Sequence, residues 1–320
     1  MLTRRYALGS LAGFFATLPA SGLKAQARLG AWTQEKPLSS VRAEVAAAAL
    51  LGHLHAVGGN EENVAEANHE AYDPGTNTWQ ARAPLPVARD HVAVAESGGK
   101  LYAMGGFFTP VHKGASSEAF EYDPAADTWR RLSPMPTARG AAAAAAVNGK
   151  VHVIGGRGHE GKTLSAHEIY DPQSGQWQSA APLPGARDHL AVVAMDAKVH
   201  VIAGRFGSPV ERTGQHDVYD PASGQWSSAK PLPTPRSGVV GVAYSGLILV
   251  LGGELPPDHT FPENEGYDPK TDAWTTLAPM PHGRHGFGGG VLGDDAFFVG
   301  GSLTPGDGGA TNQLIKFHLG

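Results

Sequence analysis

The feature that most constrains this chain is the phrase Tyr-Asp-Pro-x4-Trp, which returns with a nearly constant period. Five copies occupy residues 72–79, 122–129, 170–177, 219–226 and 267–274, and Trp32 is a sixth copy of the last part only. These six residues are all the tryptophans of the chain, and they follow one another at spacings of 47, 50, 48, 49 and 48 residues. A fixed period of this length indicates repeated supersecondary units that stack on one another.

Two further features keep the same period. A glycine pair closes an apolar run at 58–59, 105–106, 155–156, 252–253 and 300–301, and is weakened to Ala203-Gly204 in one copy. An arginine opens the run before each pair, at Arg42, Arg89, Arg139, Arg187, Arg236 and Arg284. Glycine suits places where backbones approach closely, because a side chain would clash there.

One unit shows how the repeat is predicted to fold. Residues 91–95 alternate as a strand, Gly98-Gly99 form a turn, and residues 100–104 return as a second strand. After a variable loop, a third strand ends at Tyr122, and Asp123-Pro124 starts a turn into a fourth strand near Trp129. A single four-stranded sheet is too small to be stable alone, whereas sheets stacked around an axis bury their faces.

These features together resemble the kelch repeat over the whole chain after its first 27 residues. The resemblance implies an all-β fold, a β-propeller with four antiparallel strands per blade. The last copy has its arginine and a third strand at 314–318, but no Trp strand follows, while residues 29–36 contain Trp32. We therefore expect a six-bladed kelch β-propeller over 28–320, whose last blade combines residues 284–320 with the N-terminal strand in residues 28–38.

The first 27 residues are predicted to be an export signal. Arg4-Arg5 precede an apolar stretch from Ala7 to Ala20, and Ala25-Gln26-Ala27 is a small-x-small cleavage site. Paired arginines favour the twin-arginine route, with an ordinary secretory signal or an uncleaved anchor as alternatives. We expect a periplasmic or secreted monomer with no membrane span after cleavage. Removing the signal leaves a net charge of −8, which argues against nucleic acid as a partner.

The predicted binding face follows from the direction of the strands. Each arginine, the residue after it, and the residue after each glycine pair share one end of the propeller. In the kelch proteins that this chain resembles, side chains near the position after the arginine and at the position after the glycine pair line the mouth of the central channel. The predicted ligand-binding residues at this face are Asn60, Asp90, Arg157, Asp188, Arg205, Ser237, Glu254 and His285. Mixed charges of this kind suit a small hydroxylated ligand, and solvated rim charges without a ligand are the alternative.

Two other patterns are interpreted as structural. The ring of arginines either holds an anion or, as we favour, ties one blade to the next through backbone carbonyls. Arg-Asp-His occurs at 89–91 and 187–189, but neighbours on a strand point to opposite sides, so Asp90 and His91 are not expected to converge. We therefore predict no metal site and no cofactor. His55, His152 and His200 are interpreted as packed substitutes for aromatic residues.

Three function classes follow from the resemblance. The first and favoured one is a binding module for a carbohydrate or a protein at the loop face. The second is a sugar mutarotase or epimerase similar to N-acetylneuraminate epimerase, although no matching motif places its catalytic residues. The third, the copper oxidase class that shares kelch blades, needs a tyrosine crosslinked to a cysteine, and this chain has no cysteine.

Overall fold

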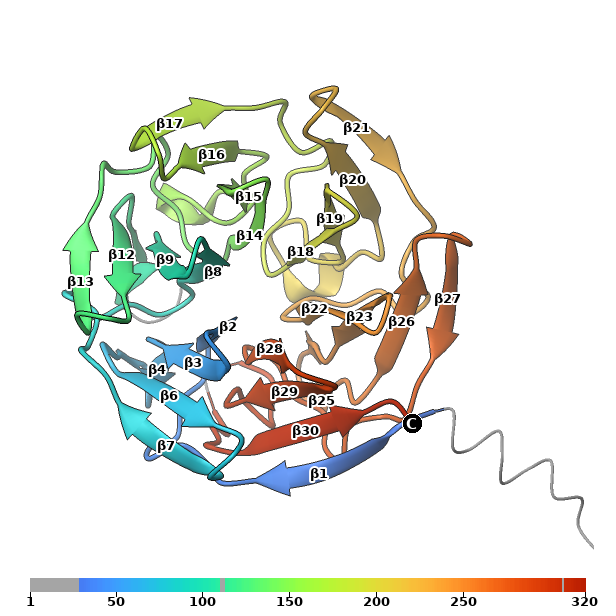
Figure 1. Ribbon diagram of the computed structural model, residues 1–320. Coiled ribbons are helices and arrows are strands. Elements are labelled where there is room, and N and C mark those ends of the chain that lie inside the picture. Colours follow the sequence, from blue (N-terminus) through green and yellow to red (C-terminus); the bar gives the residue numbers. More distant parts are fainter. Residues whose placement is uncertain (1–28, 110–112, 307) are drawn as a thin grey trace, which may run out of the picture.

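Six four-stranded antiparallel sheets surround a central axis in the computed structural model (Figure 1), which describes residues 29–109, 113–306 and 308–320. This confirms the predicted six-bladed all-β propeller. The predicted export signal, residues 1–27, lies outside the described residues. No helix in the described part of the chain has the length and apolar composition that crossing a membrane requires.

The blades share one strand order from the axis outward, and we number them from 1 to 6 along the chain. The innermost strands are β2 (Ala46–Leu50), β8 (Ala93–Ser97), β14 (Ala143–Val147), β18 (Ala191–Met195), β22 (Val240–Tyr244) and β28 (Gly288–Leu292). The second strands are β3 (His53–Val57), β9 (Lys100–Met104), β15 (Lys150–Ile154), β19 (Lys198–Ile202), β23 (Leu247–Leu251) and β29 (Asp295–Val299). The third strands are β6 (His69–Asp73), β12 (Ala119–Asp123), β16 (His167–Asp171), β20 (His216–Asp220), β26 (Asn264–Asp268) and β30 (Leu314–His318). The outermost strands are β7 (Thr78–Ala81), β13 (Thr128–Arg131), β17 (Gln176–Ser179), β21 (Gln225–Ser228), β27 (Ala273–Thr276) and β1 (Ala31–Glu35).

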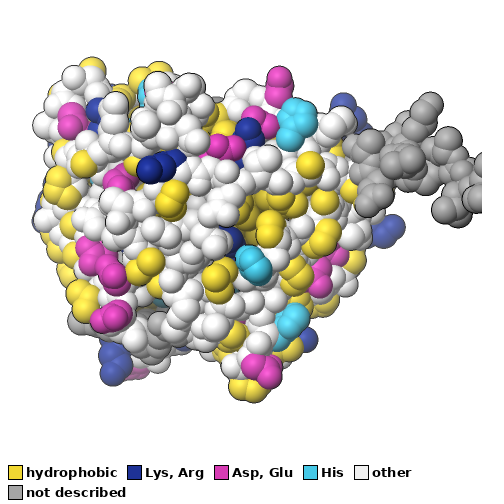
Figure 2. All heavy atoms as spheres, turned by 90° about the horizontal axis from the view of Figure 1, so that it is seen from below, with side chains coloured by type: hydrophobic (Ala, Val, Ile, Leu, Met, Phe, Trp, Pro, Cys, Tyr) yellow, Lys and Arg dark blue, Asp and Glu magenta, His cyan; other side chains and the backbone are white. Residues whose placement is uncertain are grey.

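The two ends of the described chain meet in blade 6. Strand β1 pairs antiparallel with β30, from Ala31 opposite His318 to Glu35 opposite Leu314, so the N-terminal strand completes the last sheet as predicted. Figure 1 shows β1 lying along the outside of β30. The wall of the propeller on this side carries apolar and charged side chains interspersed with one another (Figure 2).

Neighbouring blades meet at the glycine pairs. In blade 2, Gly106 N donates to the carbonyl of Arg139 in blade 3 at 3.0 Å, and a Cβ on Gly105 would lie 2.2 Å from the same oxygen. The second glycine of each pair, or Gly204 in blade 4, donates in the same way to the arginine carbonyl of the next blade. The approach leaves little room for a side chain: blade 4 accommodates only the methyl group of Ala203 at the first position, and the second position is glycine in all six blades.

The six repeated arginines are structural, but they act within a blade. Arg139, which is fully buried, pairs with Glu168 of β16 at 2.6 Å and donates to the carbonyl of Val153 in β15 at 3.1 Å, all in blade 3. The side chains of the other five likewise reach a carboxylate or amide on or just before the third strand of their own blade. The prediction that the side chains tie one blade to the next is therefore wrong, because the carbonyls within reach belong to the same sheet. In five blades a carboxylate compensates the buried charge of the arginine, whereas Arg284 donates to the neutral side-chain amide of Gln313.

The loops between the second and third strands differ from blade to blade and lie at the end of the propeller that we call the loop face. They contain the hairpins β4 (Asn60–Glu61) with β5 (Val64–Ala65), β10 (Phe107–Thr109) with β11 (Lys113–Ala115), and β24 (Glu254–Leu255) with β25 (His259–Thr260). Blades 3 and 4 have instead the short 3₁₀ helices η1 (His159–Gly161) and η2 (Pro209–Glu211). The Tyr-Asp-Pro turns lie at the opposite end, between the third and fourth strands.

Candidate functional site

The predicted site positions lie together around the axis at the loop face. In every blade the residue after the arginine forms a β-bridge with the residue after the glycine pair. The bridges are Ala43–Asn60, Asp90–Phe107, Gly140–Arg157, Asp188–Arg205, Ser237–Glu254 and His285–Ser302. The sequence therefore predicted correctly which residues share this face, and their part in binding a ligand stays a prediction.

Five of the eight predicted residues contact one another, and Asp188 is at the centre of this group. Its carboxylate, fully buried, lies 2.8 Å from Arg205 Nε and 3.4 Å from Arg157 Nε, and accepts a hydrogen bond from Thr163 Oγ1 at 2.8 Å. Burial alone would raise the pKa of Asp188. The hydrogen bond from His189 and the positive charges of Arg205 and Arg157 instead hold that pKa far below its usual range.

Arg205 carries the network from blade 4 to blade 5. Its Nη1 lies 2.9 Å from Glu254 Oε1, and Glu254 Oε2 accepts from the backbone N–H of Gly306 at 2.9 Å. His285 Nε2 lies 3.7 Å from the same Glu254 oxygen and 3.0 Å from the carbonyl of Thr304. Most of these side chains are therefore buried against one another, and only Arg157, whose side chain is 12 % exposed, also faces the loops above.

Asn60 and Ser237 occupy equivalent places without joining this network of ion pairs. Both are buried, at 7 % and 0 % exposure, and each contributes the backbone bridge of its own blade. Asp90 joins the network from the other side, through His91 and Glu44.

A ring of residues that the sequence analysis missed lies directly on the axis. We call it the axial ring, and it consists of the second residue after each arginine: Glu44, His91, Ala141, His189, Gly238 and Gly286. All six have positive φ angles, between 49° and 74°. Their backbones are hydrogen-bonded from blade to blade around the axis, for example His189 N to the Ala141 carbonyl at 3.0 Å, and Val45 N closes the ring on Gly286. Glycine at this position in blades 5 and 6 was the signal that could have identified it.

The axial ring overturns the expectation that the Asp-His pairs diverge. His91 Nδ1 lies 2.9 Å from Asp90 Oδ1, and His189 Nδ1 lies 2.6 Å from Asp188 Oδ1. The argument from strand alternation was wrong because the backbone of both histidines is in the left-handed conformation, with φ angles of 49° and 55°. The inner strand of blade 2 also begins at Ala93 and not at residue 91, so strand alternation does not apply to Asp90 and His91. A left-handed residue turns its side chain back beside that of its neighbour.

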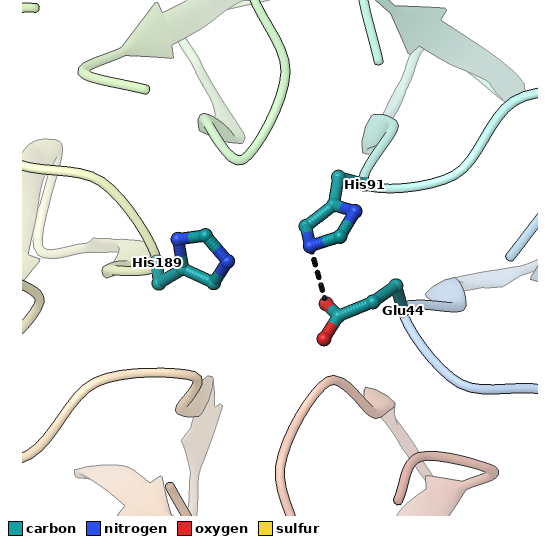
Figure 3. Close-up of side chains that lie close together, drawn as sticks. All are labelled: Glu44, His91 and His189. Carbon is teal, nitrogen blue, oxygen red and sulfur yellow. Dashed lines mark ion pairs between the residues drawn. The ribbon is translucent and has the colours of Figure 1, made fainter. Parts of the chain in front are cut away.

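The axial ring brings Glu44, His91 and His189 toward one point from blades 1, 2 and 4 (Figure 3). His91 Nε2 lies 3.2 Å from Glu44 Oε2, and His285 Nδ1 lies 3.4 Å from Glu44 Oε1. Burial would lower the pKa of His91, but Glu44 and Asp90 raise it above the ordinary value. Burial and the charge of Arg205 lower the pKa of His189 to about 4. The two imidazoles therefore differ in basicity although their surroundings look alike.

A cavity of about 170 Å³ lies on the axis beside this ring. Apart from the axial ring, its wall consists of the residue just before each innermost strand and the first residues of that strand, which are mostly alanine, valine or glycine, as in residues 142–144 and 239–241. The small side chains keep the centre of the propeller open, and the imidazoles and the carboxylate are the ionisable groups that line it among the described residues.

A second hollow opens on the loop face between blades 2 and 3. This loop-face cleft has a volume of about 420 Å³ and is lined by Lys113, Arg157, His159 and Glu160 together with three glycines. Phe108, whose ring is next to Gly114 of the cleft, is 46 % exposed. Arg157 is thus the one predicted residue that belongs both to the buried network and to an open cleft of the described structure.

The comparisons with known proteins agree with this architecture. The profile of the KLHDC2/KLHL20/DRC7 Kelch-repeats domain matches residues 90–301. Among solved structures, the "Structure of YjhT" superposes with a TM-score of 0.76 and 17 % sequence identity, covering 87 % of this chain and 95 % of the other. At that identity the likeness concerns the fold alone. No curated protein matches the chain. The repeat, the blades and the profile match over more than half of the chain show that this protein belongs to the kelch-repeat family.

Proposed function

We propose that this protein is an exported binding module that takes an acidic carbohydrate in the loop-face cleft. Kelch propellers generally serve binding, and the fold supports that broad role. The observation that carries the finer proposal is the cleft itself, where Lys113 and Arg157 lie with His159 and Glu160 in one open hollow.

The chemistry of the cleft fits a sugar that bears a carboxylate. Two cationic side chains attract the carboxylate, and a guanidinium binds it through two parallel hydrogen bonds. His159 and Glu160 supply further donors and acceptors for hydroxyl groups. The guanidinium of Arg89 stacks on one face of the Phe108 ring, 3.7 Å from its centroid, and the exposed part of the ring offers an apolar surface to the C–H face of a sugar ring.

A thermal-shift screen of the protein without residues 1–27 tests this proposal. We expect acidic sugars such as N-acetylneuraminate and galacturonate to raise the melting temperature, and neutral sugars to raise it less. Arg157→Ala should weaken binding of the best acidic sugar by about 10- to 100-fold, because a charged hydrogen bond is lost. Arg130→Ala is the matched control, since Arg130 lies on the outer strand β13 and its side chain is 67 % exposed. Equal binding by both variants, or no stabilisation by any sugar, would contradict the proposal.

A protein partner is the second candidate, favoured by apolar side chains exposed on the loop face. Four of the six exposed large hydrophobic residues in the described chain lie in these loops: Val64, Phe108, Phe206 and Val210. They come from blades 1, 2 and 4 and are dispersed around the face, whereas the cleft is continuous. We therefore rank the sugar first.

The sugar mutarotase alternative is supported by the paired imidazole and carboxylate at the axial cavity. Glu44 and His91, 3.2 Å apart, are groups that can exchange protons with a sugar hydroxyl. NMR exchange between the anomers of N-acetylneuraminate measures this activity directly. Acceleration over buffer that Glu44→Gln abolishes would favour the enzyme, and no acceleration would exclude it for this sugar.

A further inference from the structure

Three donor atoms converge on the propeller axis from blades that are far apart in the sequence. One ligand atom each from Glu44, His91 and His189 lies within 4.8 Å of the other two. The remaining members of the axial ring are Ala141, which has only a methyl group, and Gly238 and Gly286, which have no side chain, so the middle of the ring stays open. Figure 3 shows the three side chains pointing from separate blades toward this middle.

Both imidazoles are held in the orientation that a metal site requires. The carboxylates of Asp90 and Asp188, each fully buried, lie at hydrogen-bond distance from the Nδ1 atoms of the histidines that follow them. A hydrogen on Nδ1 leaves the lone pair on Nε2, which is the atom aimed at the axis. Metal-binding histidines almost always have such a carboxylate or carbonyl behind them, because it fixes the tautomer and makes the imidazole a better donor.

The side chains around the axial ring carry more negative than positive formal charges, which favours the binding of a cation. By formal charge, this network contains four acidic side chains, Glu44, Asp90, Asp188 and Glu254, and two arginines, Arg157 and Arg205. With neutral imidazoles, two negative charges remain in a largely buried place. A divalent cation compensates these two charges.

Two neighbours oppose an ion at this point. Arg205 Nη2 lies 3.1 Å from His189 Nε2, so its guanidinium must turn away before that nitrogen binds a metal. His285 Nδ1 lies 3.4 Å from Glu44 Oε1 and leaves Glu44 Oε2 for the ion. Both contacts lower the affinity of the site without closing it, because Arg205 remains held by Asp188 and Glu254 through its other nitrogens.

We propose that Glu44, His91 and His189 bind one divalent transition-metal ion, of the zinc class, on the axis of the propeller. Two imidazoles and one carboxylate are a ligand set that zinc takes with a fourth position left for water or another ligand. The fourth position faces the axial cavity of about 170 Å³, which has room for a small molecule. The metal site would thus lie between the axial cavity and the buried network of ion pairs at the loop face.

Metal titration of the chelator-treated protein tests the proposal. We expect the protein without residues 1–27 to bind one equivalent of Zn²⁺ by calorimetry, and Co²⁺ to give the visible absorption of a site with nitrogen ligands and low coordination number. His91→Ala combined with His189→Ala should weaken Zn²⁺ binding at least 100-fold and remove the Co²⁺ absorption. The double variant is expected to fold, because Ala141 occupies the same ring position in blade 3 with a φ of 51°.

His282→Ala is the matched control, since His282 is exposed in the connection before Arg284 and should leave both signals unchanged. Asp188→Asn should weaken Zn²⁺ binding about 10- to 100-fold while leaving the ligands in place, which a merely structural carboxylate would not do. If the double variant does not fold, Glu44→Gln with the Co²⁺ spectrum gives the same decision. No saturable binding by the wild type, or binding that persists in a folded ligand variant, would overturn the proposal.

Discussion

The outer wall and the axis of this propeller are built from the same repeat, but they use it differently. On the outer wall all six tryptophans donate from Nε1 to a carbonyl beside the outermost strand of the preceding blade, at 2.7–2.9 Å. At the axis the six equivalent positions contain glutamate, histidine, alanine and glycine, although their backbones form one closed ring of hydrogen bonds. Where a side chain makes the contact between blades it must repeat, and where the backbone makes it the side chains are free to differ and to form a site.

The repeated arginine of each blade lies between the outer wall and the axis. Replacing one of these arginines should have the largest effect on the free energy of unfolding. Arg139→Ala leaves the buried carboxylate of Glu168 without its partner, so we expect the free energy of unfolding to fall by about 3–5 kcal/mol. Urea denaturation followed by tryptophan fluorescence measures the loss. Arg130→Ala removes an exposed arginine from the outer strand of blade 2, the neighbouring blade, and should lower the free energy of unfolding by about 1 kcal/mol or less. Equal losses would mean that the buried ion pair of Arg139 with Glu168 contributes no more to stability than an exposed ion pair does.

Pairs of buried histidines occur in blades 1, 3 and 4, and they should make the protein sensitive to acid. In blade 3, His152 Nδ1 lies 2.9 Å from His167 Nε2, and burial lowers the pKa of His152 to about 4 and that of His167 to about 3. The unfolded chain takes up these protons near pH 6.5, whereas the folded chain does not until far lower pH. Stability is therefore complete above pH 6.5 and is lost as the pH falls from 6.5 toward 4.

Replacing one pair should flatten this dependence by an intermediate amount. His152→Tyr combined with His167→Ala copies blade 2, which has Tyr102 and Ala119 at these places. We expect the loss of unfolding free energy between pH 7.5 and 5.5 to be about 2.7 kcal/mol smaller than in the wild type, since each histidine contributes about 1.4 kcal/mol. Urea denaturation at the two pH values gives the difference, and His282→Ala should leave the dependence as it was. An unchanged slope in the double variant would show that the pair is not neutral in the folded state.

The sequence was sufficient to predict the blades and their strands, because each of these elements repeats along the chain. Trp32, together with the missing Trp strand of the last copy, predicted that the first strand closes the last blade, and the pairing of β1 with β30 confirms it. The second strand of blade 2 was predicted at residues 100–104, the bounds that β9 has. The interpretation of His55, His152 and His200 as packed residues is confirmed by their burial. Their partners in the third strands were missed, although those histidines stand three residues before the repeated tyrosine in the same three blades.

The site could not be predicted as well, because it depends on what does not repeat. A left-handed backbone at His91 is invisible in a strand-like run of residues, so its contact with Asp90 appeared only in the structure. The partners of the arginines were also hidden, since Glu168 lies 29 residues after Arg139. Pattern reasoning placed Arg157, Asp188 and Arg205 on one face correctly, but their burial against one another follows from side-chain packing that no periodicity encodes.

The smallest effect is expected on the outer wall itself, where one of six equal contacts is removed. Trp177→Phe keeps an aromatic ring against Tyr170 but loses the hydrogen bond from Nε1 to the Ser133 carbonyl, 2.8 Å long. Because Trp177 is only half-buried, water can replace the lost donor, and we expect a loss of about 1 kcal/mol in the free energy of unfolding. Val210→Ser, on the loop face and 66 % exposed, should change it by less than about 0.5 kcal/mol. Urea denaturation of both variants decides whether the wall contributes more than the loops. The loss for Trp177→Phe could prove no larger than that for Val210→Ser. In that case the repeated tryptophans hold neighbouring blades together by ring packing alone, and the hydrogen bond from Nε1 is not the contact that distinguishes the wall from the axis.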